Sequence, residues 1–243
     1  MSGFDQEALS ERLGRDVVFF ESIPSTNEEA MRLASLGASH GTLVVANGQV
    51  GGKGRLGRSW HSPPGLNLYF SLVLRPKVGL DRVALLGLAC AVGIAESLSL
   101  SIKWPNDLLD AERRKVAGIL SELECQGRAV GHVVLGVGIN VNQVEFPEDL
   151  PQAGSLCRTQ GPQDRGEVLT GVVGSIEHWC ERVEAAPAEV LSRWRTHWAD
   201  RGEAVVVGDR QGIAEDVRED GALMLRTPSG LEPVLSGDVV RAG

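Results

Sequence analysis

The ten residues Gly51-Gly52-Lys53-Gly54-Arg55-Leu56-Gly57-Arg58-Ser59-Trp60 are the most informative part of this chain, because they combine four glycines with three cations. Glycine lets the backbone approach a ligand closely and turn successive N–H groups toward it. Lysine and arginine add charge-assisted hydrogen bonds to phosphate or carboxylate oxygens. The stretch therefore predicts a loop that binds an anion, although a glycine-rich surface hairpin with solvated cations has the same composition.

Two familiar phosphate-binding motifs do not fit this loop. Residues 52–57 match G-x-G-x-x-G, but a dinucleotide-binding loop must open a helix, and the tandem prolines at 63–64 prevent one. A Walker-type loop needs glycine at position 47 and serine or threonine after Lys53, where this chain has Asn47 and Gly54. Neither the Rossmann nor the Walker interpretation holds.

The composition is that of an ordinary globular protein. The 243 residues are 42% hydrophobic, which is enough for a full core, and the longest nearly apolar run, 83–95, is too short to span a bilayer. With 24 basic and 32 acidic residues the net charge is −8, which opposes sequence-independent binding of nucleic acid. The cysteines lack metal-binding spacing. We therefore expect a cytoplasmic protein with neither nucleic-acid nor membrane partners.

Apolar periodicity predicts an α+β domain over residues 1–199. Ser25-Thr26-Asn27-Glu28 has the pattern of a capping box and indicates a helix that begins at Ser25. Asp81 is expected to cap a core helix that runs to Leu98. We expect strands at 17–20, 42–46, 66–74, 101–104, 107–109, 115–124 and 133–141, and further helices at 167–183 and 188–198. The glycine-rich loop then joins two strands.

A hairpin is expected to bring a carboxylate and an amine together. If residues 110–114 form its turn, Leu109 lies opposite Lys115, and Asp107 lies diagonally across from Lys115 on the same face, at roughly 7 to 8 Å. The strand that follows has glycine at alternate positions, Gly136 and Gly138, so that one face is cleared for a ligand or another backbone.

The sequence pattern changes near residue 200, where short expected strands alternate with turns such as Ser236-Gly237-Asp238. This pattern predicts a small β-barrel domain over residues 200–243, built from strands at 204–207, 213–217, 222–225, 231–235 and 239–241.

Five sequence blocks, in this order, together resemble the biotin protein ligases. The blocks are Ser25-Thr26-Asn27, Gln49 with Gly52–Trp60, Lys103-Trp104-Pro105-Asn106-Asp107, Lys115-Val116-Ala117-Gly118-Ile119-Leu120 and Gly136-Val137-Gly138-Ile139-Asn140. The resemblance extends from about residue 16 to the C-terminus. It implies a central mixed sheet flanked by helices, like that of class II aminoacyl-tRNA synthetases and lipoate ligases, and an SH3-like C-terminal barrel.

The resemblance also implies a two-step reaction. Biotin and ATP, with magnesium, give biotinyl-5′-AMP and pyrophosphate, and the biotinyl group then forms a C–N bond with one lysine of a biotin carboxyl carrier domain, as in acetyl-CoA carboxylase. In the first step a carboxylate attacks a phosphate, so two anions must meet. Unit charges about 4 Å apart interact by about 4 kcal/mol at an effective dielectric near 20, so three loop cations offset much of that repulsion.

Site residues follow by resemblance. Lys115, Asp107 and Arg55 are the expected catalytic residues, with Lys115 at the reacting oxygens and Asp107 orienting or deprotonating the acceptor lysine. Biotin would be bound by Ser25, Thr26, Asn27, Gln49, Lys53, Gly54, Arg55, Lys115 and Gly118. ATP would be bound by Arg55, Leu56, Arg58, Trp60, Asn106, Lys115 and Asn140. The protein is expected to fix no metal by itself, with magnesium near Asn106 and Asp107.

Several of these residues have structural alternatives. Ser25 fits a helix cap, Lys115 fits a strand end whose stem packs on apolar surface, and Trp60 and Trp104 fit a core. The family often has arginine where this chain has Lys53, which keeps the charge but loses the planar fork.

Other functions remain to be weighed. A lipoate or octanoate transferase lacks the three-cation loop and the block at 103–107, and a non-catalytic biotin or nucleotide sensor belongs to another class. Only about fifteen residues precede the first expected strand, too few for the winged-helix DNA-binding domain of many members, so we expect no transcriptional repression. The enzyme is expected to be a monomer or a homodimer.

Overall fold

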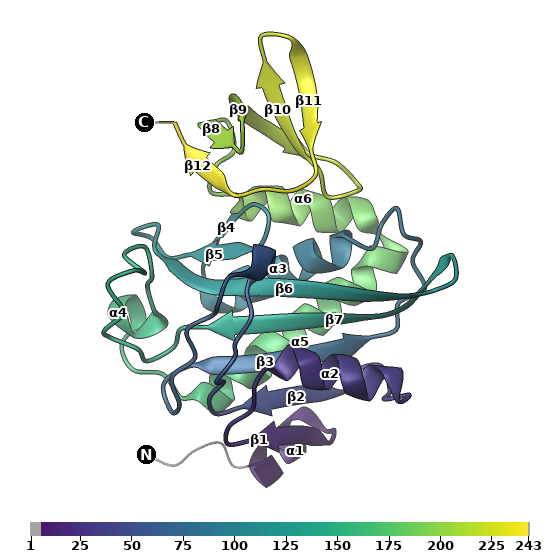
Figure 1. Cartoon of the computed structure of the whole chain (residues 1–243), viewed down its shortest axis with the longest axis vertical. Coiled ribbons are helices and arrows are strands. Elements are labelled where there is room, and N and C mark those ends of the chain that lie inside the picture. Colours follow the sequence, from purple (N-terminus) through teal and green to yellow (C-terminus); the bar gives the residue numbers. More distant parts are fainter. Residues whose placement is uncertain (1–5, 243) are drawn as a thin grey trace.

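Two β-sheets organise the protein in the computed structural model, which describes residues 6–242 (Figure 1). Residues 1–5 and 243, which the expected domain ranges include, lie outside the described residues. The larger sheet has seven strands and the C-terminal sheet has five. The C-terminal sheet lies at one end of the larger domain, beside helix α6 (Pro187–His197).

The large sheet is mixed, as expected. Its strand order is β1-β2-β3-β7-β6-β5-β4, and only the β1–β2 pair is parallel. The strands are β1 (Val17–Phe20), β2 (Leu43–Ala46), β3 (Leu68–Leu74), β4 (Ser101–Lys103), β5 (Asp107–Leu109), β6 (Lys115–Gln126) and β7 (Ala129–Ile139). Strand β3 is buried at every position, so its alternating leucines do not mark one solvated face.

Helices cover both faces of this sheet. Helix α2 (Thr26–Ser35) lies on the front face in Figure 1, and α3 (Leu85–Leu98) and α5 (Arg165–Ala185) lie behind it. The shorter helices are α1 (Gln6–Leu13) and α4 (Leu156–Gln160). The expected core helix is confirmed, because most of α3 is buried.

The predicted start of α3 was wrong. The helix begins at Leu85 after Ala84, not after Asp81. Residues 79–86 make tighter i→i+3 bonds first: Leu85 N–H donates to Arg82 O at 2.9 Å, and Leu86 N–H donates to Val83 O at 3.1 Å. These successive turns delay the regular helix by about one turn.

The C-terminal strands form an antiparallel sheet in the order β11-β10-β9-β8-β12. They are β8 (Ala204–Val207), β9 (Arg210–Val217), β10 (Leu223–Thr227), β11 (Gly230–Val234) and β12 (Val239–Arg241). Trp104 is buried and its indole N–H donates to Gly221 O at 3.0 Å. Asp200, also buried, is paired with Arg113 and Arg241. These contacts attach the sheet to the larger domain.

No helix within residues 6–242 is long and apolar enough to cross a membrane. The most apolar helix, α3, has 14 residues, whereas a transmembrane helix needs about 20.

Candidate active site

A cavity of about 340 Å³ lies on the front face of the large sheet. Its walls are the glycine-rich loop, the first residues of α2, parts of β5, β6 and β7, and the loop at 146–153. All of the residues assigned by resemblance line this cavity except Leu56. The fold therefore collects residues from positions 25 to 140 around one space.

The glycine-rich loop folds back on itself as a narrow hairpin. Gly54 N–H donates to Arg58 O at 2.7 Å, and Trp60 N–H donates to Gly52 O at 2.9 Å. A side chain at position 52 would overlap the backbone oxygen of Trp60, so the loop requires glycine there. In Figure 1 the loop rises from β2 across the front of β7 and β6 toward the C-terminal sheet.

Leu56, which is assigned to ATP by resemblance, does not line the cavity. It lies in the short 3-10 turn Arg55–Gly57 with φ 57°, and the residue is 72% exposed. The left-handed backbone at Leu56 and Gly57 turns the chain sharply, so the leucine side chain points to solvent while Arg55 lines the cavity.

Lys115 and Asp107 share one pocket, as the hairpin predicted, and they form an ion pair there. Lys115 Nζ lies 2.6 Å from Asp107 Oδ1. Leu109 lies opposite Lys115 as expected, but a β-bulge between Leu108 and Leu109 moves Asp107 opposite Gly118. The two charged groups are therefore in direct contact, whereas a regular hairpin would place them diagonally and further apart.

The backbone of Lys115 is fixed by a segment that the sequence did not single out. Lys115 N–H donates to Gln152 O at 2.7 Å, and Gly154 N–H donates to Lys115 O at 2.9 Å. Lys115 Nζ also lies 5.2 Å from the centre of a Trp60 ring, within cation–π range. Strand, loop and indole together hold this amine in the cavity wall.

The alternate glycines of β7 accommodate specific neighbours. A side chain at Gly136 would overlap the Asn27 amide, and one at Gly138 would overlap the Trp60 indole. Gly118, which pairs with Gly138, faces Trp60 as well. The expectation that something lies against this face is confirmed, and Trp60 occupies the cavity wall instead of the core.

The start of α2 is capped differently from the prediction. Ser25 is the N-cap residue, but its side chain accepts no hydrogen bond from the helix. The backbone N–H of Thr26 instead donates to Gln49 Oε1 at 2.9 Å, and Gln49 Nε2 donates to Ser62 Oγ at 3.0 Å. The predicted capping box was therefore wrong, because a residue 23 positions further along the chain satisfies the helix N–H.

Asn27 and Asn140 are held in place by side-chain hydrogen bonds. Ser71 Oγ donates to Asn27 Oδ1 at 2.6 Å, and Asn27 Nδ2 donates to Glu122 Oε2 at 2.7 Å. Asn140 Nδ2 donates to Gly154 O at 2.9 Å. These amides fix the cavity walls, and each of them also lines the cavity.

Each loop cation has an oxygen partner. Lys53 Nζ lies 2.6 Å from Glu28 Oε1, and this hydrogen bond raises the pKa of Lys53. Arg55 Nη1 donates to Asn106 Oδ1 at 3.1 Å. Burial lowers the pKa of Arg55, while the nearby carboxylate of Asp238 opposes that shift.

Sequence reasoning missed two parts of the site. One is the cavity wall at 146–153, which was expected only as a polar connecting loop. The other is the turn before β12, where Asp238 pairs with Arg58. Proline and glycine marked both segments as turns, but no local pattern indicated what they touch.

A magnesium site at Asn106 and Asp107 does not fit their surroundings. Asn106 Oδ1 accepts a hydrogen bond from Arg55, and Asp107 Oδ1 lies against the Lys115 amine. Both oxygens thus face cations, which repel a metal ion. No cluster of three histidine, cysteine, aspartate or glutamate side chains suited to a metal occurs in residues 6–242.

The sequence and the architecture correspond to those of known ligases. The chain matches the Biotin/lipoate A/B protein ligase family over residues 19–140 and the Biotin protein ligase C terminal domain over residues 202–241. It is 34% identical over 238 residues to the biotin--[acetyl-CoA-carboxylase] ligase of Paracoccus denitrificans, covering 90% of this chain and 98% of that one.

Two further comparisons agree with this class. The chain is 32% identical over 245 residues to the bifunctional ligase/repressor BirA of Bacillus subtilis, covering 95% of this chain and 75% of that one. It superimposes on the biotin protein ligase from Aquifex aeolicus, solved in complex with biotin and ATP, with a TM-score of 0.79, 33% identity, and 93% and 99% coverage. The chain belongs to the Biotin/lipoate A/B protein ligase family and, within it, to the biotin ligases.

Proposed function

We propose that this enzyme joins biotin to ATP as biotinyl-5′-AMP and then transfers biotin to one lysine of a biotin carboxyl carrier domain. The observation that carries the proposal is the convergence of Lys53, Arg55, Arg58 and Lys115 on one cavity. The Aquifex aeolicus relative is described with biotin and ATP, and the Paracoccus denitrificans relative is named as a ligase for acetyl-CoA carboxylase.

The cations suit the first step. The biotin carboxylate attacks the α-phosphate of ATP, so negative charge gathers between two reactants that repel each other. Lys115, fixed on its strand, is placed to contact the carboxylate and phosphoryl oxygens together. Arg55 and Arg58 supply further donors from the loop. Because the cavity is partly closed from water, each of these contacts is stronger than it would be at a free surface.

Biotin needs a different set of partners. Its ureido ring has polar N–H and C=O groups on an apolar body, so a pocket must satisfy the first and bury the second. The buried side chains of Ser25 and Thr26 and the amide of Gln49 lie at the start of α2, where they offer hydroxyl and amide groups to such a ring. We assign this end of the cavity to the ureido ring.

Asp107 suits the second step. The acceptor amine must lose a proton before it attacks the mixed anhydride, and a carboxylate beside Lys115 is placed to orient that amine or accept its proton. Magnesium would enter with the phosphates of ATP, which it prefers together with water. We derive no step from a protein-bound metal, since the protein oxygens at Asn106 and Asp107 are engaged by cations.

The remaining assignments are also proposals. We assign the enzyme to the cytoplasm and propose that it acts as a ligase without a repressor role. The net charge of −8 disfavours DNA. Binding of the purified protein to promoter DNA at physiological salt would contradict the last assignment.

Biotin-dependent exchange of labelled pyrophosphate into ATP tests the first step. A biotin ligase shows exchange with biotin, a lipoate enzyme shows it only with its own acid, and a sensor shows none. A streptavidin blot after incubation with biotin, ATP and a carrier domain tests the second step. The control is the same carrier domain with its acceptor lysine replaced by arginine, which should remain unlabelled.

A further inference from the structure

Each of the three guanidinium nitrogens of Arg58 already has an oxygen partner. Its Nη2 donates to Asp238 Oδ1 at 3.0 Å, and its Nη1 lies 3.0 Å from Asp238 Oδ2, so the carboxylate bridges the two terminal nitrogens. Its Nε donates to Arg55 O at 3.2 Å. A phosphate that uses the planar fork of Arg58 must therefore displace a partner that is already in place.

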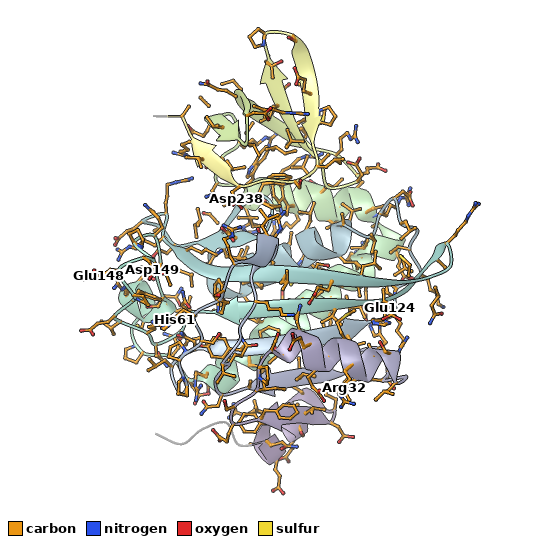
Figure 2. All side chains as sticks on the ribbon, viewed as in Figure 1. Arg32, His61, Glu124, Glu148, Asp149 and Asp238 are labelled. Carbon is orange, nitrogen blue, oxygen red and sulfur yellow. The ribbon has the colours of Figure 1, made fainter. Side chains whose placement is uncertain are left out.

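The turn that carries Asp238 is built into the C-terminal sheet. Gly237 has φ 141°, and a side chain there would overlap Val207 of β8, so this position requires glycine. Gly237 O also receives a hydrogen bond from Arg55 Nη1 at 3.5 Å. The turn thus touches both arginines of the loop from a fixed base, and Figure 2 shows Asp238 where the C-terminal sheet meets the larger domain.

The Arg58–Asp238 ion pair is exposed enough for another anion to replace Asp238. The side chains of Arg58 and Asp238 are 55% and 43% exposed, and an exposed ion pair contributes only about 0 to 1 kcal/mol. A triphosphate carries several charges and can engage the same fork together with the neighbouring loop cations. The anion with the larger charge should therefore replace the carboxylate.

We propose that Asp238 is a positioning residue that holds Arg58 in the nucleotide-free enzyme and releases it to the phosphates of ATP. The C-terminal domain then takes part in nucleotide binding through a contact that must open. The proposal rests on the proposed function, because it takes ATP as the incoming anion. It assigns a role to Asp238 that acts through Arg58 and not by contact with substrate.

The test measures pyrophosphate exchange for wild type and Asp238→Asn, which keeps the side-chain shape but removes its charge. We expect the KM for ATP to fall about two- to fivefold, in line with loss of an exposed ion pair, while kcat and the KM for biotin stay unchanged. The matched control is Asp209→Asn, which removes the same charge from an exposed turn of the same domain. It should leave all three constants at the wild-type values.

A double-variant cycle separates positioning from general repulsion of the nucleotide. In an Arg58→Ala background the Asp238→Asn change should have no effect on the KM for ATP. If the KM still falls there, or if Asp238→Asn alone raises it or leaves it unchanged, the proposal is overturned. Wild-type protein that shows no biotin-dependent exchange at all would instead refute the proposed function.

Discussion

Two walls of the cavity carry the same kind of ion pair in different surroundings. On the sheet wall, Lys115 and Asp107 stand on neighbouring strands, and their side chains are 32% and 20% exposed. On the loop wall, Arg58 pairs with Asp238 and Lys53 pairs with Glu28, and each of these side chains is at least 43% exposed. Both walls pair a cation with a carboxylate, but the sheet wall is built from strands and the loop wall from a loop.

Because of this difference, we expect the sheet wall to stay rigid and the loop wall to move when a ligand binds. Strands β5 and β6 fix their side chains through backbone ladders, so we expect the sheet wall to keep its geometry through the reaction, as preorganised catalysis requires. The loop is held by a few backbone bonds and by pairs that water competes for. It can therefore close on a ligand by exchanging one set of anionic partners for another.

The largest expected effect is on the sheet wall. Lys115→Ala should lower the rate of adenylate formation at least about a hundredfold, or about 2.7 kcal/mol, because the variant loses the fixed cation that we propose contacts the reacting oxygens. Pyrophosphate exchange measures the rate, and thermal melting checks that the fold is intact. Lys103→Ala, on edge strand β4 beside β5 and outside the cavity lining, is the control. Near-normal exchange by Lys115→Ala would exclude Lys115 from the reaction.

Two glycine substitutions on β7 test whether helix α2 is more rigid than the glycine-rich loop. Gly136→Ala should lower the free energy of unfolding by about 1 to 3 kcal/mol, because the new methyl group meets Asn27 of helix α2. Gly138→Ala should lower it less, since the methyl group meets Trp60 on the loop, which can move away. Urea denaturation measures both. Equal losses would mean that the loop is as rigid as the helix.

Ligand binding should change the loop wall alone. Without ligand, we expect residues 48–60 to exchange amide hydrogens readily; with biotin and ATP, the exchange should slow by roughly tenfold, or about 1.4 kcal/mol. Strands β6 and β7 should show no comparable change. Hydrogen exchange followed by mass spectrometry measures both regions in one sample, and equal protection of the loop in the two states would contradict this expected difference between the two walls.

The smallest expected effect concerns Glu28→Gln on the loop wall. Glu28 raises the pKa of Lys53, so the stability from this pair is fully present below the ordinary lysine pKa and is lost as the pH rises through the raised value. At neutral pH the variant should be less stable by no more than about 1 kcal/mol. Urea denaturation at neutral and alkaline pH measures the difference, and a difference that grows with alkaline pH would contradict this sign.

The order and type of most elements could be predicted because the signals are local. Apolar periodicity located the strands and the buried helix, and the turn at 110–114 brought Lys115 and Asp107 to one face. Boundaries were weaker where short-range bonds compete, as at the start of α3. The bulge at Leu108–Leu109 also escaped prediction, because it depends on how β5 fits between its neighbours.

The sequence by itself determined the glycine-rich loop, the glycines that clear the face of β7, the shared pocket of Lys115 and Asp107, and membership of the biotin ligases. Each of these depends on residues near one another in the chain or on a set of motifs. Only the tertiary structure decided which oxygens hold the loop cations, that Gln49 caps α2 and that Leu56 points outward. The reason is physical: Arg58 and Asp238 are 180 residues apart, and only the packing of two domains brings their charges together.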